Sequence, residues 1–346
     1  MSFAPFLNRI INRENLTAGE AEALMQLILT GQASSPQIAA MLVGLRMKGE
    51  TPDEILGFAR AMRGQSVRVP VAVGPGEHLV DTCGTGGDGS NTFNISTVAA
   101  LVVAGAGAKV AKHGNRSISS QCGSADILEG LGVRIELAPE LVGECIRETG
   151  FGFFYAPRIH PAVRHAQEAR TALKMRTAFN LLGPLTNPAG ATVQVVGAPS
   201  IRAAELMASA LASLGLVRGY VVHGLDGLDE ITTTAESLVL EIRGGAIAHH
   251  SVVPEDFGVP RASASELRGA DRETNCDIAR RVLHGERGAP RNIVLVNASA
   301  ALVAAGIAAD FFSGAEIAAN SIDSGAAVQV LHRVVEFSRR GVAAAS

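Results

Sequence analysis

The chain has 346 residues, of which 47% are hydrophobic and 18% charged, and its formal net charge is −3. This length allows two domains or one large one, and this charge gives no bulk attraction to nucleic acid or to an acidic membrane. The four cysteines lack metal-ligand spacing, so we expect them to be reduced. Residues 1–9 have no signal-peptide pattern and the apolar run 101–111 is too short to span a bilayer, so we expect a cytoplasmic protein.

Residues 1–66 predict helices only. Three helix starts carry a capping pattern or an early proline: Thr17–Glu20, Ser35–Pro36 and Thr51–Glu54. The stretch from Pro70 to Gly76 is rich in proline, glycine and valine, which is typical of a linker. We therefore expect a small α-helical domain at 1–70 and an α/β domain at 71–346.

From residue 78 onward, strand and helix patterns alternate, which predicts a mostly parallel sheet with helices on both faces. The predicted strands are 78–82, 108–111, 133–136, 151–155, 193–196 and 219–222, and the predicted helices between them are 96–106, 124–131, 139–149 and 200–214. Residues 160–173 and 178–182 interrupt this alternation as consecutive helices, so we expect the segment 160–188 to pack against the helical domain. Residues 237–248 predict an antiparallel hairpin, and the last third predicts alanine-rich helices.

A glycine-rich loop follows the first predicted strand. Residues 84–89 contain four glycines, and Ser, Thr and Asn side chains follow at 90–97. Glycine lets a backbone approach a ligand closely, and a helix start offers free N–H groups to an anion. The loop formally matches a dinucleotide fingerprint, but its helix does not begin within the glycines and no acidic residue ends the next strand. We interpret it as a phosphate loop, the simpler alternative being a glycine-rich turn.

Two further clusters follow strands of the same sheet. Cations and hydrogen-bond donors occupy Lys112–Ser120, and the adjacent carboxylates Asp229 and Glu230 lie in a loop with Gly224 and Gly227. The first cluster suits phosphate, and the second suits Mg²⁺ bound to a diphosphate. An isolated acidic pair would be interpreted as a solvated turn. Its position at a strand's carboxyl end, where ligands bind in such sheets, favours the metal site.

Together these motifs resemble the anthranilate phosphoribosyltransferase family. The resembling segments are 84–88, 91–97, 112–120, 123–126, 179–188, 223–230 and 322–325. The resemblance implies a small N-terminal α-helical domain hinged to a larger α/β domain, and a homodimer joined through the helical domains. It also implies Mg²⁺-dependent transfer of the 5-phosphoribosyl group from phosphoribosyl diphosphate (PRPP) to the amine of anthranilate, with release of diphosphate, in tryptophan biosynthesis.

The resemblance further implies roles for individual residues. PRPP contacts correspond to Gly84, Gly87, Asp88, Thr92, Asn94, Ile95, Ser96, Thr97, Lys112, His113, Gly114, Asn115, Arg116, Ser117, Ile118, Ser119, Ser120 and Ser124. Anthranilate contacts correspond to Gly84, Asn115 and Arg170, and the metal ligands to Ser96, Asp229 and Glu230. Lys174 stands where the family usually carries glycine, which affects the local backbone, at the helix end or the hinge, and not the ligand residues.

No residue in this set is expected to act as a catalytic acid or base. The aromatic amine of anthranilate is already neutral at pH 7, and the hard step is breaking the bond from ribose to diphosphate. Two relatives of the same fold are alternatives. A pyrimidine-nucleoside phosphorylase would need no diphosphate-chelating acids, and a non-catalytic nucleic-acid-binding protein would carry a basic stripe. Asp229 and Glu230 count against the first, and the net charge of −3 against the second.

Overall fold

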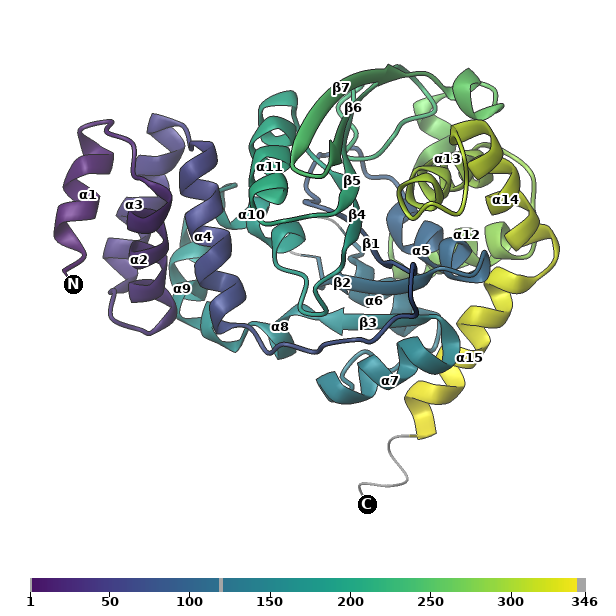
Figure 1. Cartoon of the computed structure of the whole chain (residues 1–346), viewed down its shortest axis with the longest axis horizontal. Coiled ribbons are helices and arrows are strands. Elements are labelled where there is room, and N and C mark those ends of the chain that lie inside the picture. The colour runs from purple at the N-terminus through teal and green to yellow at the C-terminus, as the bar shows by residue number, and fades with distance from the viewer. Residues whose placement is uncertain (1, 118–120, 341–346) are drawn as a thin grey trace.

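The computed structural model describes residues 2–117 and 121–340, and it contains a helical bundle beside an α/β unit (Figure 1). The bundle consists of α1 (Ala4–Ile11), α2 (Ala18–Leu29), α3 (Ser35–Lys48) and α4 (Pro52–Gln65). The predicted capping boxes form at Thr17 before α2 and at Thr51 before α4. Glu54 of the second box is fully buried, and it also accepts hydrogen bonds from Leu16 N at 3.0 Å and Lys48 Nζ at 2.9 Å. One carboxylate thus ties three parts of the bundle together.

The described residues form one seven-stranded sheet in the order β3-β2-β1-β4-β5-β6-β7. The strands are β1 (Leu79–Gly84), β2 (Lys109–Gly114), β3 (Phe151–Tyr155), β4 (Val193–Gly197), β5 (Arg218–Gly224), β6 (Ser237–Arg243) and β7 (Ala246–Val252). Neighbours among β1–β5 are parallel, whereas β5–β6 and β6–β7 are antiparallel. The mostly parallel sheet and the terminal hairpin predicted from the sequence are confirmed.

Alternate residues of the central strands face two different hydrophobic cores, as the two-residue period of a strand requires. Val195 and Val222 belong to a core with α5 and α13, whereas Val196 and Val221 belong to a core with α11 and the helical bundle. The helices from α5 to α11 are α5 (Ile95–Gly105), α6 (Ser124–Gly130), α7 (Pro139–Thr149), α8 (Ala156–Ile159), α9 (Arg164–Leu173), α10 (Phe179–Leu182) and α11 (Ile201–Ser213). The C-terminal helices are α12 (Arg272–Leu283), α13 (Ala289–Ala304), α14 (Phe311–Asp323) and α15 (Ala326–Arg340).

The segment between β3 and β4 leaves the sheet and returns to the bundle. Within it, α9 contacts α2 and α3, and α10 contacts α4. Lys174 follows α9 in the left-handed conformation, with φ of 48°. A side chain is strained in this region and glycine is not, which explains why the family's usual glycine suits this helix end. The domain boundary at residue 70 and the hinge stay predictions.

The strand predicted at residues 133–136 is wrong. The side chains of Val133 and Ile135 are buried and imitate the alternation of a strand. However, Val133 N donates to Leu128 O at the end of α6, and Arg134 N donates to Ser338 Oγ of α15 at 3.1 Å. These backbone groups are satisfied by helices, so the segment forms no ladder.

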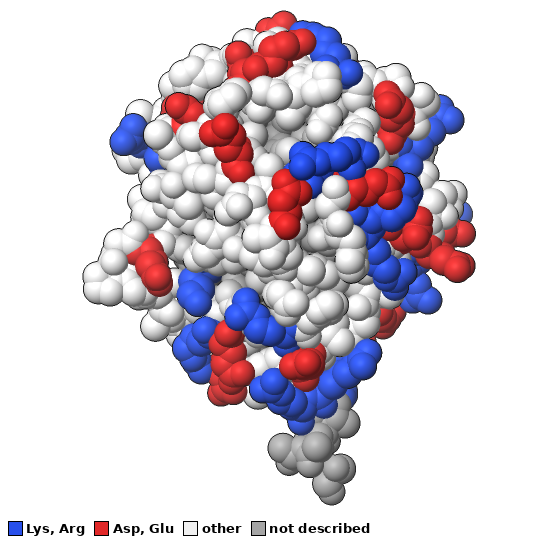
Figure 2. Space-filling view, turned by 90° about the vertical axis from the view of Figure 1, so that its right-hand side faces the viewer, with Lys and Arg blue, Asp and Glu red and all other residues white. Residues whose placement is uncertain are grey.

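Lys and Arg side chains lie close to Asp and Glu side chains over the face of the molecule drawn in Figure 2, around an uncharged centre. Within residues 2–117 and 121–340, no helix is long and apolar enough to cross a membrane. The cytoplasmic location stays a prediction.

Candidate active site

The glycine loop between β1 and α5 meets the acidic loop after β5, as the rule of strand ends predicts. Asp229 Oδ2 accepts a hydrogen bond from Gly86 N at 2.8 Å, and Asp229 N lies 3.4 Å from Asp88 Oδ2. This approach requires glycine at Gly197 of β4 and leaves little room for a Cβ at Gly84 of β1. A Cβ at Gly84 would lie 2.9 Å from Asp229 Oδ2, and one at Gly197 would lie 1.7 Å from Asp229 O.

The start of α5 collects the second acid and a buried lysine. Glu230 Oε1 accepts from Ser96 N at 3.1 Å, and Lys112 Nζ lies 3.4 Å from Ser96 Oγ. Lys112 is 1% exposed and also donates to the carbonyl oxygen of Thr82. Burial lowers the pKa of Lys112, and the carboxylates of Asp81 and Glu230 oppose that shift. The amino group of Lys112 therefore lies beneath the N-terminus of α5, where an anion would be held.

The two acids are half-buried and repel each other. Burial, and next to it the charge of Asp88, raises the pKa of Asp229 to about 7. Burial and the charge of Asp229 raise the pKa of Glu230 well above its usual range. Within the described residues, no group of three or more His, Cys, Asp or Glu side chains is placed to hold a metal ion. Asp229 and Glu230 lie beside the glycine loop, and too little positive charge surrounds them to restore their ordinary pKa values. This nevertheless fits Mg²⁺, which proteins usually bind with one or two carboxylates plus substrate phosphates.

The cluster after β2 is partly within the strand, contrary to the prediction that the strand ends at residue 111. Lys112, His113 and Gly114 pair with Phe153, Phe154 and Tyr155 of β3. This pairing extends β2 to Gly114 and explains the burial of Lys112 and His113.

Beyond β2, the chain turns toward α6. Asn115 N donates to Ser124 Oγ at 3.2 Å. The Arg116 guanidinium binds both oxygens of Glu129 at 3.0 Å and lies 2.9 Å from Asp126 Oδ1, so acids of α6 already hold its charge. The predicted site residues Ile118, Ser119 and Ser120 lie outside the described residues.

The second half of the glycine loop is anchored by a segment that the sequence did not point to. Thr92 pairs with Arg268 in an antiparallel bridge. Asn94 Nδ2 donates to Cys122 O at 3.0 Å, and Asn94 Oδ1 accepts from Asn275 Nδ2 of α12 at 3.2 Å. The amide nitrogen and the amide oxygen of Asn94 thus each have one partner that orders the loop. No local motif marks Arg268 or Asn275, because both act across more than 170 residues of chain.

Arg170, predicted to contact anthranilate, lies at the end of α9 with its guanidinium 5.0 Å from the centre of the Phe179 ring. Burial lowers the pKa of Arg170. Among the described residues no carboxylate pairs with it. A half-buried guanidinium on an aromatic ring, without an anionic partner, suits a flat aromatic carboxylate.

A buried polar network lies beneath the site. Asp81 of β1 accepts from Asn187 Nδ2 at 2.8 Å, from His113 N at 3.3 Å and from Gln194 Nε2 at 3.4 Å. Asn187 Nδ2 also donates to Ala111 O at 2.8 Å. The network fixes the end of β2 to the segment after α10. This explains why the segment 179–188 carries a polar residue, Asn187, near its end.

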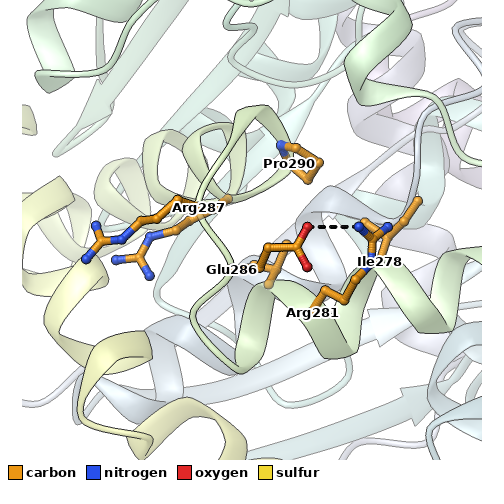
Figure 3. Close-up of a pocket in the computed structure, with 7 residues that line it drawn as sticks. Ile278, Arg281, Glu286, Arg287 and Pro290 are labelled. Carbon is orange, nitrogen blue, oxygen red and sulfur yellow. Dashed lines mark hydrogen bonds and ion pairs between the residues drawn. The ribbon is translucent and has the colours of Figure 1, made fainter.

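A separate small hollow is formed by residues 278–291, none of which belongs to the site described above. It lies between α12 and the start of α13 and is lined by Ile278, Arg281, Val282, Glu286, Arg287, Pro290 and Arg291 (Figure 3). Its interior volume is about 10 Å³, which is room for about one water molecule. Arg281 is bound there by Glu286 at 2.9 Å. The hollow is too small to hold a substrate such as PRPP or anthranilate.

Comparison with known proteins assigns the family. The helical bundle domain of a glycosyl transferase family matches residues 4–66, and the a/b domain of that family matches residues 76–328. The anthranilate phosphoribosyltransferase of Solibacter usitatus is 56% identical over 98% of this chain and 99% of its own. The crystal structure of the enzyme from Thermus thermophilus superposes with a TM-score of 0.90 at 44% identity, covering 96% of this chain and 99% of that one.

A third relative has been solved with ligands. The anthranilate phosphoribosyltransferase of Saccharomyces cerevisiae in complex with PRPP and Mg superposes with a TM-score of 0.90 at 25% identity, covering 98% of both chains. The assignment rests on the identity of 56% over 98% of this chain. The chain belongs to the anthranilate phosphoribosyltransferase family.

Proposed function

We propose that the site at the carboxyl end of β1 transfers the 5-phosphoribosyl group of PRPP to the amine of anthranilate, giving N-(5-phosphoribosyl)anthranilate and diphosphate. By its family, the chain is an anthranilate phosphoribosyltransferase, an enzyme of tryptophan biosynthesis. The location of the site is argued from two contacts, that of Asp229 with Gly86 and that of Glu230 with Ser96. Through these contacts the glycine loop, the N-terminus of α5 and the two acids lie together.

The donor would lie along the glycine loop and the start of α5, where backbone N–H groups point toward an anion. The residues proposed to contact it are those of the loop and of the β2 end given above, from Gly84 to Ser124. Asp229 and Glu230, with Ser96 beside them, would hold Mg²⁺. Bound Mg²⁺ supplies positive charge that stabilises the leaving diphosphate.

The acceptor would place its carboxylate at Arg170, with Gly84 and Asn115 beside its amine. Because the aromatic amine carries a free lone pair, the protein has to align it with the ribose and need not remove a proton first. Lys112 is almost fully buried, so little water would screen an interaction between its amino group and the leaving group.

Loss of anthranilate fluorescence in the presence of PRPP and Mg²⁺ measures the reaction directly. In Arg170→Ala, we expect KM for anthranilate to rise about tenfold to a hundredfold, because a charge-assisted pair contributes about 1.5–3 kcal/mol. KM for PRPP should hardly change. Arg164→Ala, on the exposed first turn of the same helix, is the matched control. Equal damage to both constants in Arg170→Ala would contradict the assignment.

A Mg²⁺ titration tests the two acids. Asp229→Asn/Glu230→Gln keeps the shape of the site and removes two negative charges. If the acids bind metal, activity should fall strongly at low Mg²⁺ and recover in part as Mg²⁺ is raised. A defect that no concentration of Mg²⁺ relieves, and that follows pH, would instead assign them to proton transfer.

We further propose that two copies associate through the helical bundle. Most apolar side chains of α1–α4 fill the bundle's own core, but Ile11 of α1 is 62% exposed and Met47 of α3 is 72% exposed. Light scattering should give twice the chain mass of 35.8 kDa, and Ile11→Asp/Met47→Asp should lower it to that of one chain. A parent protein that is monomeric at micromolar concentration would overturn this.

A further inference from the structure

Arg176 joins two parts of the molecule that lie far apart in the sequence. It follows the end of α9, which packs within the helical bundle at the left of Figure 1, whereas the loop that it contacts leaves β1 in the sheet. Arg176 Nη2 lies 3.2 Å from Thr85 Oγ1, and Nη1 donates to the carbonyl oxygen of Gly87. Both contacts hold the loop at the point where its glycines turn.

The stretch of loop that Arg176 holds also contacts an acid of the site. Asp88 directly follows Gly87, and Asp229 accepts a hydrogen bond from Gly86 N. Burial lowers the pKa of Arg176, and the charges of Asp229 and Asp88 oppose that shift. In the described residues no ion pair joins Arg176 to either acid. The attraction is therefore longer-range and involves no direct contact. Arg176 is therefore a cation that is bonded to the loop and attracted by Asp88 and Asp229.

The left-handed residue at the end of α9 explains how this side chain reaches the loop. Lys174 has φ of 48° and ψ of 32°, which ends the helix and turns the chain two residues before Arg176. Arg170, six residues earlier, stays on α9 against Phe179. One short segment thus carries Arg170, which is proposed to bind the acceptor, and Arg176, which holds the glycine loop.

We propose that Arg176 is a positioning residue of the donor site, which fixes residues 85–87 to the segment that follows α9 and supplies positive charge to Asp88 and Asp229 before the donor and Mg²⁺ bind. This inference rests on the proposed function of the site. Arginine is suited to the role because its planar fork makes two bonds at once, whereas lysine offers only a point charge.

Two measurements on the full chain without substrate separate the anchoring role from the charge. The first is hydrogen exchange of the backbone amides at 84–90, and the second is calorimetric binding of Mg²⁺ alone. In Arg176→Gln, we expect the loop amides to exchange about tenfold faster, because two hydrogen bonds to the loop are lost. We expect Mg²⁺ to bind about threefold tighter, because a competing cation is removed.

Two further variants divide these effects. Arg176→Lys keeps the charge, so Mg²⁺ affinity should stay within about twofold of the parent protein while loop exchange still rises. Thr85→Val removes one contact and leaves the arginine, so exchange should rise slightly and Mg²⁺ affinity should not change. Arg164→Gln, which removes an exposed positive charge from the other end of α9, should change neither measurement.

Steady-state kinetics complete the test: in Arg176→Gln, KM for PRPP should rise and KM for anthranilate should stay near the parent value. Unchanged loop exchange in that variant would overturn the anchoring role, and Mg²⁺ affinity that is unchanged or weaker would overturn the charge role. A parent protein without transferase activity would refute the proposed function instead, and the two substrate-free measurements would still decide on Arg176.

Discussion

Two neutral histidines behind the site should make the folded protein sensitive to acid. The rings of His113 and His160 meet edge to face with centroids 5.1 Å apart. His113 Nδ1 lies 3.2 Å from Gly183 O, and its buried Nε2 has no hydrogen-bond partner among the described residues. Burial, and next to it the neighbouring His160, lowers the pKa of His113 to about 3. Burial lowers the pKa of His160 to about 4.

The sign of the effect follows from where the protons bind. An unfolded histidine has a pKa of about 6.5, so between that value and the folded pKa the unfolded state binds more protons than the folded state. Stability is therefore fully present above pH 6.5 and is lost as the pH falls toward 4. Each pH unit in this window contributes about 1.4 kcal/mol per histidine. At pH 5 this is about 2 kcal/mol for each ring and about 4 kcal/mol for the pair, relative to pH 8.

Urea unfolding followed by circular dichroism at pH 8 and pH 5 measures the effect, since the chain contains no tryptophan. In His160→Gln, the loss of unfolding free energy between the two pH values should be about 2 kcal/mol smaller than in the parent protein. Contributions from the carboxylates and from Lys112 cancel in this difference. His249→Gln, at an exposed position of β7, should leave the loss unchanged. If His160→Gln and the parent protein lose the same stability, His160 is charged in the fold and the reasoning fails.

Two further predictions concern stability in the helical part of the chain. Lys174→Gly should raise the free energy of unfolding by about 1 kcal/mol, because glycine adopts φ of 48° without strain; Lys174→Ala should not, and equal melting temperatures for Gly and Ala would contradict the explanation. Glu54→Gln should lower the free energy of unfolding by about 3–5 kcal/mol, because it leaves Lys48, whose side chain is 4% exposed, without its buried partner. Glu14→Gln, an exposed acid of the same bundle, is its control in urea unfolding, and a Glu54→Gln loss no larger than that of the control would show that the buried pair adds nothing.

The sequence predicted the helix caps, which depend on neighbouring residues, and the meeting of loops that follow parallel strands. Thr17 and Thr51 cap their helices through residues three positions away, so the pattern contained the whole interaction. The meeting of Asp229 with Gly86 spans 143 residues, yet it follows from the rule that parallel strands end at one edge. Such contacts are predictable because either a local motif or the topology determines them.

The sequence failed where a contact depends on packing alone. Arg176 reaches Gly87 across 89 residues, and Asn275 reaches Asn94 across 181, with no spacing that marks either pair. The same limit explains the false strand at 133–136. Its burial pattern was correct, but a strand also needs a neighbouring strand, and a helix occupied that place. Side-chain alternation reports burial, and pairing has to be found in three dimensions.

The position of α11 has a consequence for any attempt to divide the chain. This helix lies against β5 and β6 on one side and against α4 on the other, and its apolar residues share one core with the bundle. A fragment that began at residue 71 would leave the α4 side of α11 bare, together with the sides of α9 and α10 that the bundle covers. We expect such a fragment to aggregate, since a large bare apolar surface drives self-association. The break that is visible in the sequence is a change of secondary structure, and the hydrophobic interior runs through it without interruption.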